Sequence, residues 1–157
     1  MRAAANSNSS RTHAARSFAV AVSQTLEALE PRRLFSAGDL DTAFAGGSVV
    51  QDFLHGNDFG FAVAVQSDNK VILAGSAATG TSSGNDFAVA RFNEDGTLDK
   101  TFGAGGTVIT DLGSPSDSAF AAAVQSDGKI VVAGQTSTGT TSTDFAVVRY
   151  NSDGTLD

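Results

Sequence analysis

The chain has 157 residues, with 17 glycines, 11 phenylalanines, two histidines and neither cysteine nor tryptophan. Its length suits one domain of ordinary size. The absence of cysteine excludes disulfides, zinc–thiolate centres and thiol nucleophiles. The formal net charge of −7 argues against a nucleic-acid partner, because neutralising phosphate requires a concentrated basic face. No window approaches the roughly 18 consecutive apolar residues of a spanning helix, so no transmembrane span is expected.

The charge divides the chain into a basic leader and an acidic body. Residues 1–36 hold five arginines and two glutamates, a net charge of +3, whereas residues 37–157 carry a net charge of −10. A division of this kind indicates a leader or arm followed by a folded body. We therefore predict that residues 1–37 form a separate leader.

The leader combines a cation-rich start with apolar residues at helical spacing, which are Phe18, Val22, Leu26 and Leu29. Pro31 ends such a helix, because proline has no backbone N–H to donate. The pattern matches a signal peptide in part, although its apolar core of five residues is shorter than the roughly 7 to 15 expected. An organellar transit peptide and a disordered arm with a nascent helix remain alternatives.

The body from Gly38 onward is a tandem duplication. The segment FAVAVQSDNKVILAG at 61–75 recurs 59 residues later as FAAAVQSDGKIVVAG, and NDFAVARFNEDGTLD at 85–99 recurs 58 residues later as TDFAVVRYNSDGTLD. The offset changes within a stretch rich in Ser, Thr and Gly, where a change in length indicates a loop. The body therefore divides into two repeats, residues 38–98 and 99–157, each expected to form one supersecondary unit.

Each repeat contains four runs of strand length that are rich in β-branched and aromatic residues. In the first repeat these runs are 49–53, 61–66, 70–75 and 87–93. In the last run, large residues alternate with the small Ala88 and Ala90, so both faces of that strand are largely apolar. A strand of this kind suits a sheet that is covered on both sides.

Turn residues separate these runs. Asp-Asn at 68–69 and Asp-Gly at 127–128 predict a two-residue hairpin turn between the second and third runs. The polar segments 76–85 and 135–143 contain too much Gly, Ser and Thr for a helix and are predicted to be exposed loops. Four antiparallel strands per repeat, packed on both faces, are expected of a β-propeller blade.

We therefore predict an all-β fold of two blades in a β-propeller-like array. A parallel β-solenoid is the alternative, but its coils are usually shorter and do not begin with a tight hairpin. The segments GDLDTAFAGG, AVQSDNKVILAG and DFAVARFNEDGTLDKTFGAGG resemble the delta-60 repeat family, a bacterial repeat of the β-propeller group. The resemblance covers residues 38–157. It implies many repeats in large extracellular or surface proteins without an assigned catalytic site, so an array of two repeats is expected to be incomplete.

A second resemblance lies in the leader. Residues 26–38, LEALEPRRLFSAG, resemble the LEPR-XLL motif found near the start of large exported proteins of planctomycete-type bacteria. The core Leu29-Glu30-Pro31-Arg32 is intact, and Leu34-Phe35 stands where two leucines are usual. The resemblance implies a secreted or cell-surface bacterial protein.

Two Asx-rich loops are candidate calcium sites, because hard cations bind closely spaced oxygens. If Gly96 is the sixth residue of an EF-hand loop, Phe102 is the twelfth, where a carboxylate is required, so an EF-hand is excluded. A different calcium site and an Asx turn, in which Asp and Asn side chains bond to nearby amides, remain open. The candidate ligands are Asn93, Asp95, Asp99, Asn151, Asp153 and Asp157.

Arg91 and Arg149 occupy equivalent strand positions, each five residues after an aspartate. One interpretation is an anion-binding ring along a central channel. The other is a buried or half-buried ion pair that fixes adjacent strands or blades, because an unpaired charge there is costly.

No catalytic motif stands out. The sequence has no Gly-x-Ser-x-Gly elbow and no phosphate-binding loop, and His55 is replaced by Ser114 in the second repeat. We therefore expect no catalytic residue, no cofactor and no enzymatic activity. The predicted function is a non-catalytic extracellular or cell-surface scaffold or interaction module within a larger exported protein. The alternative is a fragment or accessory domain of a propeller enzyme whose catalytic residues lie outside this chain.

Two kinds of partner are expected. The Ser/Thr/Gly loops at 79–84 and 138–142 are predicted to present a surface to a protein or polysaccharide. Two blades also leave apolar sheet faces and unpaired edges in water, and repeat units generally need about three copies for stability. We therefore expect the isolated chain to be marginally stable, to self-associate through its exposed blade faces, or to be the opening piece of a longer gene.

Overall fold

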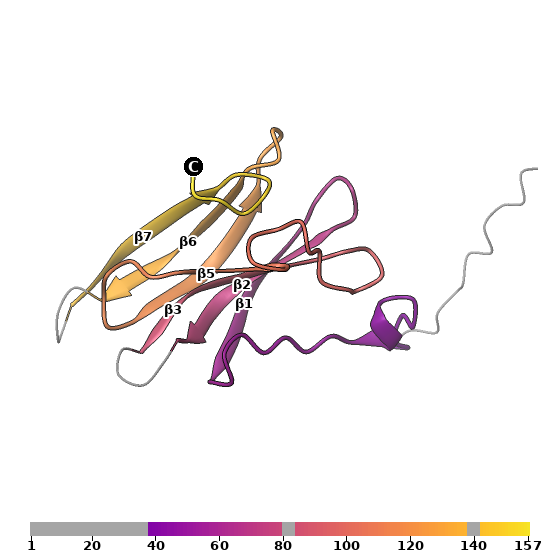
Figure 1. Cartoon of the computed structure of the whole chain (residues 1–157), viewed down its shortest axis with the longest axis horizontal. Helices are drawn as coiled ribbons and strands as arrows, with labels where there is room; N and C mark the ends of the chain where they lie inside the picture. The colour runs from indigo at the N-terminus through magenta and orange to yellow at the C-terminus, as the bar shows by residue number, and fades with distance from the viewer. Residues whose placement is uncertain (1–37, 80–83, 138–141) are drawn as a thin grey trace, which may run out of the picture. The chain divides into compact units, whose positions relative to one another are not determined.

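The computed structural model describes residues 38–79, 84–137 and 142–157, so the predictions made for the leader lie outside the described residues. The regular structure is almost entirely β (Figure 1). No helix in the described ranges has the length and apolar character needed to cross a membrane. The elements are η1 (Ala45–Gly47), β1 (Asp58–Val65), β2 (Val71–Ala78), β3 (Asn85–Phe92), β4 (Thr107–Thr110), β5 (Asp117–Val124), β6 (Ile130–Ser137) and β7 (Thr143–Tyr150).

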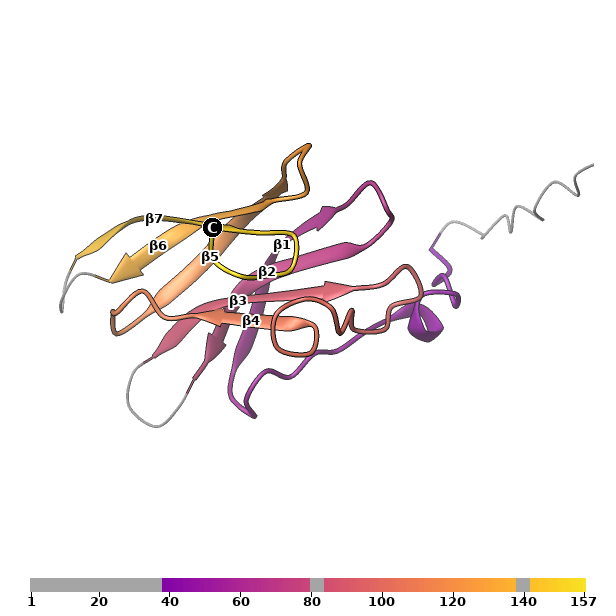
Figure 2. The same cartoon turned by 45° about the horizontal axis from the view of Figure 1, so that its top comes forward.

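The strands form two antiparallel sheets. Sheet 1 has the order β1-β2-β3-β4 and sheet 2 the order β5-β6-β7, so strands that are consecutive in sequence pair within each sheet. Figure 2 shows the two sheets as stacked layers. The predicted all-β fold of antiparallel blades is confirmed, and the parallel solenoid alternative is wrong.

The two repeats share fine detail of the backbone. The pairing of β1 with β2 shifts register between Gly60 and Ala62, and the pairing of β5 with β6 shifts at the corresponding place. Opposite each bulge stands a glycine, Gly75 or Gly134, whose position leaves no room for a Cβ because a backbone carbonyl of the bulged strand lies against it.

The sheets are offset from the sequence repeats. The fourth strand of sheet 1 is β4, which comes from the beginning of the second sequence repeat. Its counterpart in the first repeat, residues 48–51, is not assigned to a strand, so the strand predicted at 49–53 is wrong. A short extended segment needs a neighbouring edge to complete its hydrogen bonds, and the described part of the chain provides none there.

The predicted hairpins are present, but the turn is longer than expected. Positive φ occurs at Asn69 (64°) and Gly128 (83°), and the backbone amide of Gln66 bonds to the carbonyl of Lys70 at 2.8 Å. These loops therefore have three residues, a type I turn followed by one left-handed residue, because Asp68 does not adopt the positive φ of a two-residue primed turn.

The predicted loops are also shorter than expected. Residues 76–78 and 135–137 continue β2 and β6, and Ser76 is buried. These small and polar residues pair with β3 and β7, as Ala78 does with Asn85, and this pairing satisfies their backbone groups. The centres of both loops lie outside the described residues.

One hydrophobic core joins the sheets. It consists of Ile72, Ala74, Phe87, Val89, Phe102, Ala119, Ile130, Val132, Ala146, Val148 and Tyr150. On the opposite face of sheet 1, Ala88, Ala90 and Phe92 are buried as well. The prediction that both faces of the last strand are apolar and covered is therefore confirmed for β3.

The two sheets do not contact each other through equivalent faces. Ile72 in β2 corresponds to Val131 in β6, yet the buried residues of β6 are its neighbours Ile130 and Val132. One face of sheet 1 thus packs on the other face of sheet 2. The face of sheet 2 that carries Phe145, Val147 and Arg149, called here the outer face, is covered by no other sheet of the described residues.

Candidate functional site

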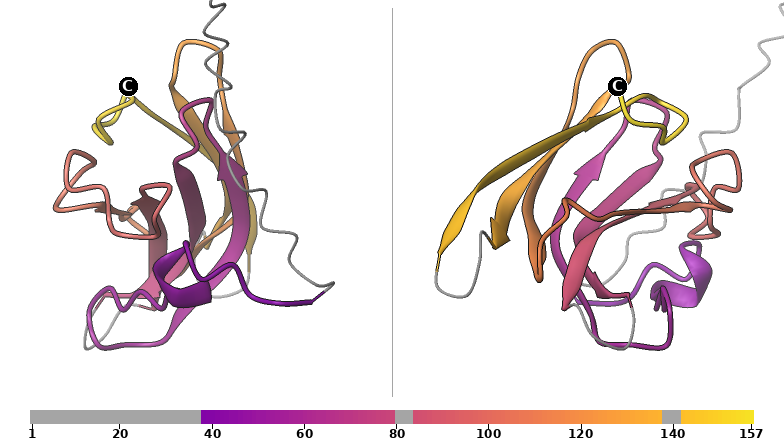
Figure 3. Two further views of the ribbon diagram at one scale, coloured as in Figure 1. Left: turned by 90° about the vertical axis from the view of Figure 1, so that its right-hand side faces the viewer. Right: turned by 60° about the vertical axis from the view of Figure 1, so that its left-hand side comes forward.

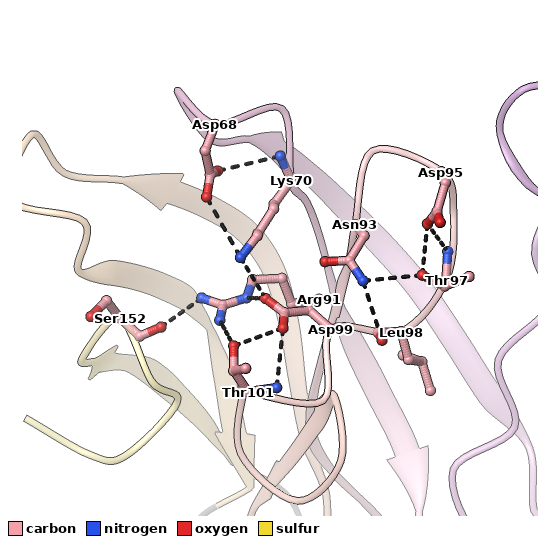
Figure 4. Close-up of polar contacts among 10 residues, drawn as sticks. All are labelled: Asp68, Lys70, Arg91, Asn93, Asp95, Thr97, Leu98, Asp99, Thr101 and Ser152. Atoms are coloured by element: carbon pink, nitrogen blue, oxygen red, sulfur yellow. Dashed lines mark hydrogen bonds and ion pairs between the residues drawn. The ribbon is translucent and has the colours of Figure 1, made fainter.

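A polar cluster lies at the end of β3 and is centred on Arg91 (Figure 4). The guanidinium donates through Nε to Asp99 Oδ2 at 2.8 Å and through Nη2 to Thr101 Oγ1 at 3.2 Å. Its Nη1 donates to the backbone carbonyl of Ser152 at 2.5 Å. Arg91 is buried, so each of its three nitrogens has a partner within the protein.

Asp99 is the anion of this cluster. Its Oδ2 also accepts from Lys70 Nζ at 2.9 Å, and its Oδ1 accepts from the backbone amide (3.0 Å) and hydroxyl (2.7 Å) of Thr101. Burial alone would raise the pKa of the Asp99 carboxyl, but the hydrogen bonds from Thr101 and Lys70 and the charge of Arg91 outweigh it. The pKa of Asp99 is held well below its usual range, so the carboxylate is charged at neutral pH.

The sequence brings Asp99 back to Arg91 through a tight turn. After β3, the amide of Gly96 bonds to the carbonyl of Asn93, and the amide of Asp99 bonds to the carbonyl of Arg91 at 2.9 Å. Gly96 has a φ of 80°, which few other residues adopt. Asp95 Oδ1 accepts from the amide of Thr97 at 2.9 Å, which is an Asx turn.

The corresponding turn after β7, at Asp153-Gly154, docks on residues 102–103, in a contact called here the joint. The amide of Gly103 donates to the carbonyl of Asp153 at 2.7 Å, and the guanidinium of Arg91 lies 4.7 Å from the centre of the buried Phe102 ring. Gly154 packs so closely that a Cβ there would be 3.0 Å from this ring. The cluster therefore ties sheet 1 to the turn that follows β7.

The same kind of joint occurs a second time, at the start of the described chain. The amide of Ala45, which follows Phe44, donates to the carbonyl of Asp95 at 2.8 Å. A Cβ on Gly96 would be 2.8 Å from the Cβ of Ala45. In each sheet, the Asp-Gly turn after β3 or β7 thus bonds to the chain segment that precedes the first strand of that sheet.

The second repeat has the same ion pairs but not the same surroundings. Arg149 Nε donates to Asp157 Oδ2 at 2.6 Å, and Lys129 also pairs with Asp157. The hydrogen bonds from Lys129 and Arg149 lower the pKa of Asp157. The Arg149 side chain is 49% exposed, against 6% for Arg91.

The ion-pair interpretation of the arginines is therefore confirmed at Arg91. The partner is the aspartate eight residues later, Asp99, and not Asp86, the aspartate five residues earlier. Asp86 instead accepts from the hydroxyl of Thr79.

The six calcium candidates take part in turn and ion-pair contacts. Asn93 Nδ2 donates to Thr97 Oγ1 at 3.0 Å, Asp95 caps its own turn, and both oxygens of Asp99 accept from the protein. Asn151, Asp153 and Asp157 repeat these contacts. Calcium binding in these turns stays a prediction, which calorimetric titration with calcium tests.

Sequence reasoning missed a cluster of three carboxylates. Oxygens of Asp86, Asp111 and Asp117 lie within 4.8 Å of one another, and carboxylates at such spacing are the ligand type that Ca²⁺ prefers. Asp117 already accepts from the Leu112 amide at 2.9 Å and from the hydroxyl of Ser114. The sequence signal that could have found this cluster is repetition. Each of these aspartates has an aspartate counterpart in the other repeat, which are Asp144, Asp52 and Asp58.

A cavity of about 890 Å³ opens beside the polar cluster, between the tips of the β1–β2 and β5–β6 hairpins. Its lining contains serines but no histidine, so these residues do not combine a nucleophile with a histidine base. The lining residues are Val65, Gln66, Ser67, Asp68, Lys70, Arg91, Thr101, Val124, Gln125, Ser126, Gly128, Ser152 and Asp153.

Comparison with known families agrees with this architecture. A family model described as "Domain of unknown function (DUF5122) beta-propeller" matches residues 66–102 and 125–157. The chain is a propeller-like repeat protein. In this propeller-like protein, both matched segments begin at the hairpin turn and include the lysine, arginine and aspartate of the ion pairs. No curated protein matches the chain.

Proposed function

We propose that the chain is a non-catalytic repeat scaffold of an exported bacterial protein. The observation that supports this proposal is that each nitrogen of the Arg91 guanidinium has a partner within the protein. Its nitrogens bond to Asp99, Thr101 and the Ser152 carbonyl, and its plane lies by the Phe102 ring. A guanidinium with these partners ties sheet 1 to the turn after β7, which supports a structural role for Arg91.

The proposal of a secreted or cell-surface location rests on the leader and on the repeats. The resemblances to the LEPR-XLL motif and to delta-60 repeats both point to large exported proteins. The Ser/Thr/Gly-rich loops at 79–84 and 138–142 are the segments proposed to meet a protein or polysaccharide partner.

Cell fractionation tests the location. The full chain with a C-terminal epitope tag, expressed in a planctomycete-type bacterium, should be recovered from the medium or the cell surface. Arg32→Ala, within the LEPR core, should retain the tag inside the cell, whereas Arg11→Ala should not. Recovery of the unaltered chain only from the cytoplasm would contradict the proposed location.

Enzyme assays test the non-catalytic role. The purified chain should show no turnover of chromogenic esters, phosphate esters or glycosides above buffer. Turnover that disappears on substitution of Lys70 by Met, in a variant that remains folded, would instead favour the fragment of a propeller enzyme.

A further inference from the structure

The two sheets differ by one strand. In sheet 1, β4 pairs antiparallel with β3, with Phe87 opposite Thr110, Ala88 opposite Ile109 and Val89 opposite Val108. In sheet 2, β7 is the counterpart of β3, and no strand in the described ranges pairs with its other edge. This edge presents unpaired backbone groups, which favour the addition of another strand.

The chain contains a counterpart of β4 that pairs with no strand of the described residues. LDTAFAGGSVVQD at 40–52 corresponds to LDKTFGAGGTVITD at 98–111, so residues 48–51 correspond to β4. Ser48 has an extended backbone (φ −159°, ψ 151°), and Val50 is 94% exposed. Residues 48–51, called here the donor segment, thus begin with an extended residue and have no partner strand among the described residues.

The stretch 44–51, which contains the donor segment, already makes half of the contacts that its counterpart makes. The stretch from Phe102 to Thr110 docks on the turn of sheet 2 through Gly103 and pairs with sheet 1 through β4. The earlier stretch docks on the turn of sheet 1 through Ala45, but no described strand lies beside its strand half.

The donor segment and β7 of the same copy are far from each other. The bond from Ala45 to Asp95 holds the donor segment at the turn after β3. Figures 1 and 3 show the segment before β1 and the β7 strand on opposite sides of the two-sheet stack. The donor segment is therefore placed to pair with sheet 2 of another molecule and not with sheet 2 of its own copy (Figures 1 and 3).

The outer face of sheet 2 also exposes side chains that are buried in sheet 1. Phe145 is 100% exposed and Val147 is 68% exposed, whereas their counterparts Phe87 and Val89 are fully buried against sheet 2. Arg149 has its aspartate but no counterpart of the Ser152 carbonyl that Arg91 receives. Contiguous apolar side chains beside an open strand edge are typical of an interaction surface.

We propose that copies of this chain associate head to tail, the donor segment of one copy adding as the fourth strand to β7 of the next. Sheet 1 of the donating copy then covers the outer face, as sheet 2 covers sheet 1 within one copy. The register follows from β3 and β4, with Val50 opposite Ala146 and Val49 opposite Val147. The two surfaces differ, so repetition gives rings or filaments. This inference deepens the proposed scaffold function, on which it rests, by naming a second copy as the partner.

Cysteine cross-linking tests the register, because the natural chain has no cysteine. Full-length Val50→Cys and Ala146→Cys chains, mixed under mild oxidation, should form a disulfide-linked heterodimer. Val50→Cys mixed with Asp127→Cys, at the exposed hairpin tip, is the matched control and should not cross-link. Efficient homodimers of Ala146→Cys alone would show that two β7 edges pair with each other and would overturn the head-to-tail arrangement.

Sedimentation velocity tests the association itself. The unaltered chain should form dimers and larger species as its concentration rises. Phe145→Asp and Val50→Pro should abolish this association without unfolding the chain, because both side chains are exposed, whereas Ser126→Asp should not. A chain that stays monomeric throughout its soluble range, or one that associates equally in all four forms, would overturn the inference. Neither result tests catalysis or export. The proposed function is therefore tested separately, by the fractionation and enzyme assays.

Discussion

The two repeats have nearly the same sequence and backbone but opposite surroundings. Phe87 and Arg91 in sheet 1 are buried, whereas Phe145 and Arg149 occupy the same positions in sheet 2 and face solvent. The difference does not come from the residues themselves. It arises because sheet 2 covers sheet 1, and no sheet in the described part of the chain covers the outer face of sheet 2.

This comparison shows that a repeat specifies its own contact surfaces but not their burial. Each sheet carries two apolar faces, an arginine–aspartate pair and an edge for a fourth strand. Whether these features contribute to stability depends on the neighbouring unit. Substitutions at equivalent positions should therefore differ in effect, and the following pairs measure that difference.

The largest difference is expected for the phenylalanines. Phe87→Ala removes a fully buried ring from the core between the sheets and should lower the free energy of unfolding by about 3 to 5 kcal/mol. Phe145→Ala removes a fully exposed ring and should leave that free energy nearly unchanged. Urea unfolding of the two variants at a concentration where the chain is monomeric measures both values. Equal losses would mean that the outer face is covered.

The arginines should give the next largest difference. Arg91→Met leaves the buried Asp99 without one of its two cationic partners and the Ser152 carbonyl without this donor, which should cost about 3 kcal/mol. Arg149→Met should cost much less, because that pair is half exposed. The same unfolding measurement applies, and a larger effect at Arg149 would contradict the role given to the polar cluster.

The joint is tested by glycine substitution. Gly154→Ala forces a left-handed residue (φ +89°) and brings its Cβ within 2.8 Å of the Gly103 amide nitrogen. Gly128 has a similar φ (+83°), but a Cβ there would be 3.7 Å from its nearest neighbour, Ser152. Gly128→Ala should therefore cost only the backbone strain, about 1 kcal/mol, without a steric clash. Thermal unfolding should show Gly154→Ala to be the less stable of the two. Equal melting temperatures would indicate that the joint adds nothing.

The smallest predicted effect is a dependence on pH. The pKa of Asp99 is lower in the folded chain than in the unfolded chain, so its contribution is complete above the unfolded value and is lost as pH falls through the folded value. The stability advantage of the unaltered chain over Asp99→Asn should therefore shrink from about pH 5 downward. Urea midpoints across this range measure it, and a constant difference would show that Asp99 is not held charged by the cluster.

Much of the fold could be predicted from the sequence, because the strands and turns are local. The alternation in β3, the Asp-Asn and Asp-Gly turns and the duplication itself were enough for antiparallel blades. The sequence did not show that Ser76 to Ala78 continue a strand, because small polar residues lack a strand pattern and are held there by pairing with β3.

The remaining features depend on contacts between units. The pattern at 48–51 is as strand-like as that of β4, and only the presence of a neighbouring edge separates them. The same holds for Arg91, whose partners include a carbonyl 61 residues away. It also holds for the carboxylates of Asp86 in β3, Asp117 in β5 and Asp111, which follows β4. Single-sequence patterns describe one unit and do not reveal which unit lies beside it.

Hydrogen exchange of the backbone amides tests the central claim most directly, namely that sheet 2 ends in an open edge and an open face. In dilute solution, amides of β3, which has strands on both sides, should be strongly protected, while those on the outer edge of β7 should exchange rapidly. Protection in β7 should then rise with protein concentration as copies associate. Equal and concentration-independent protection of β3 and β7 would contradict the account.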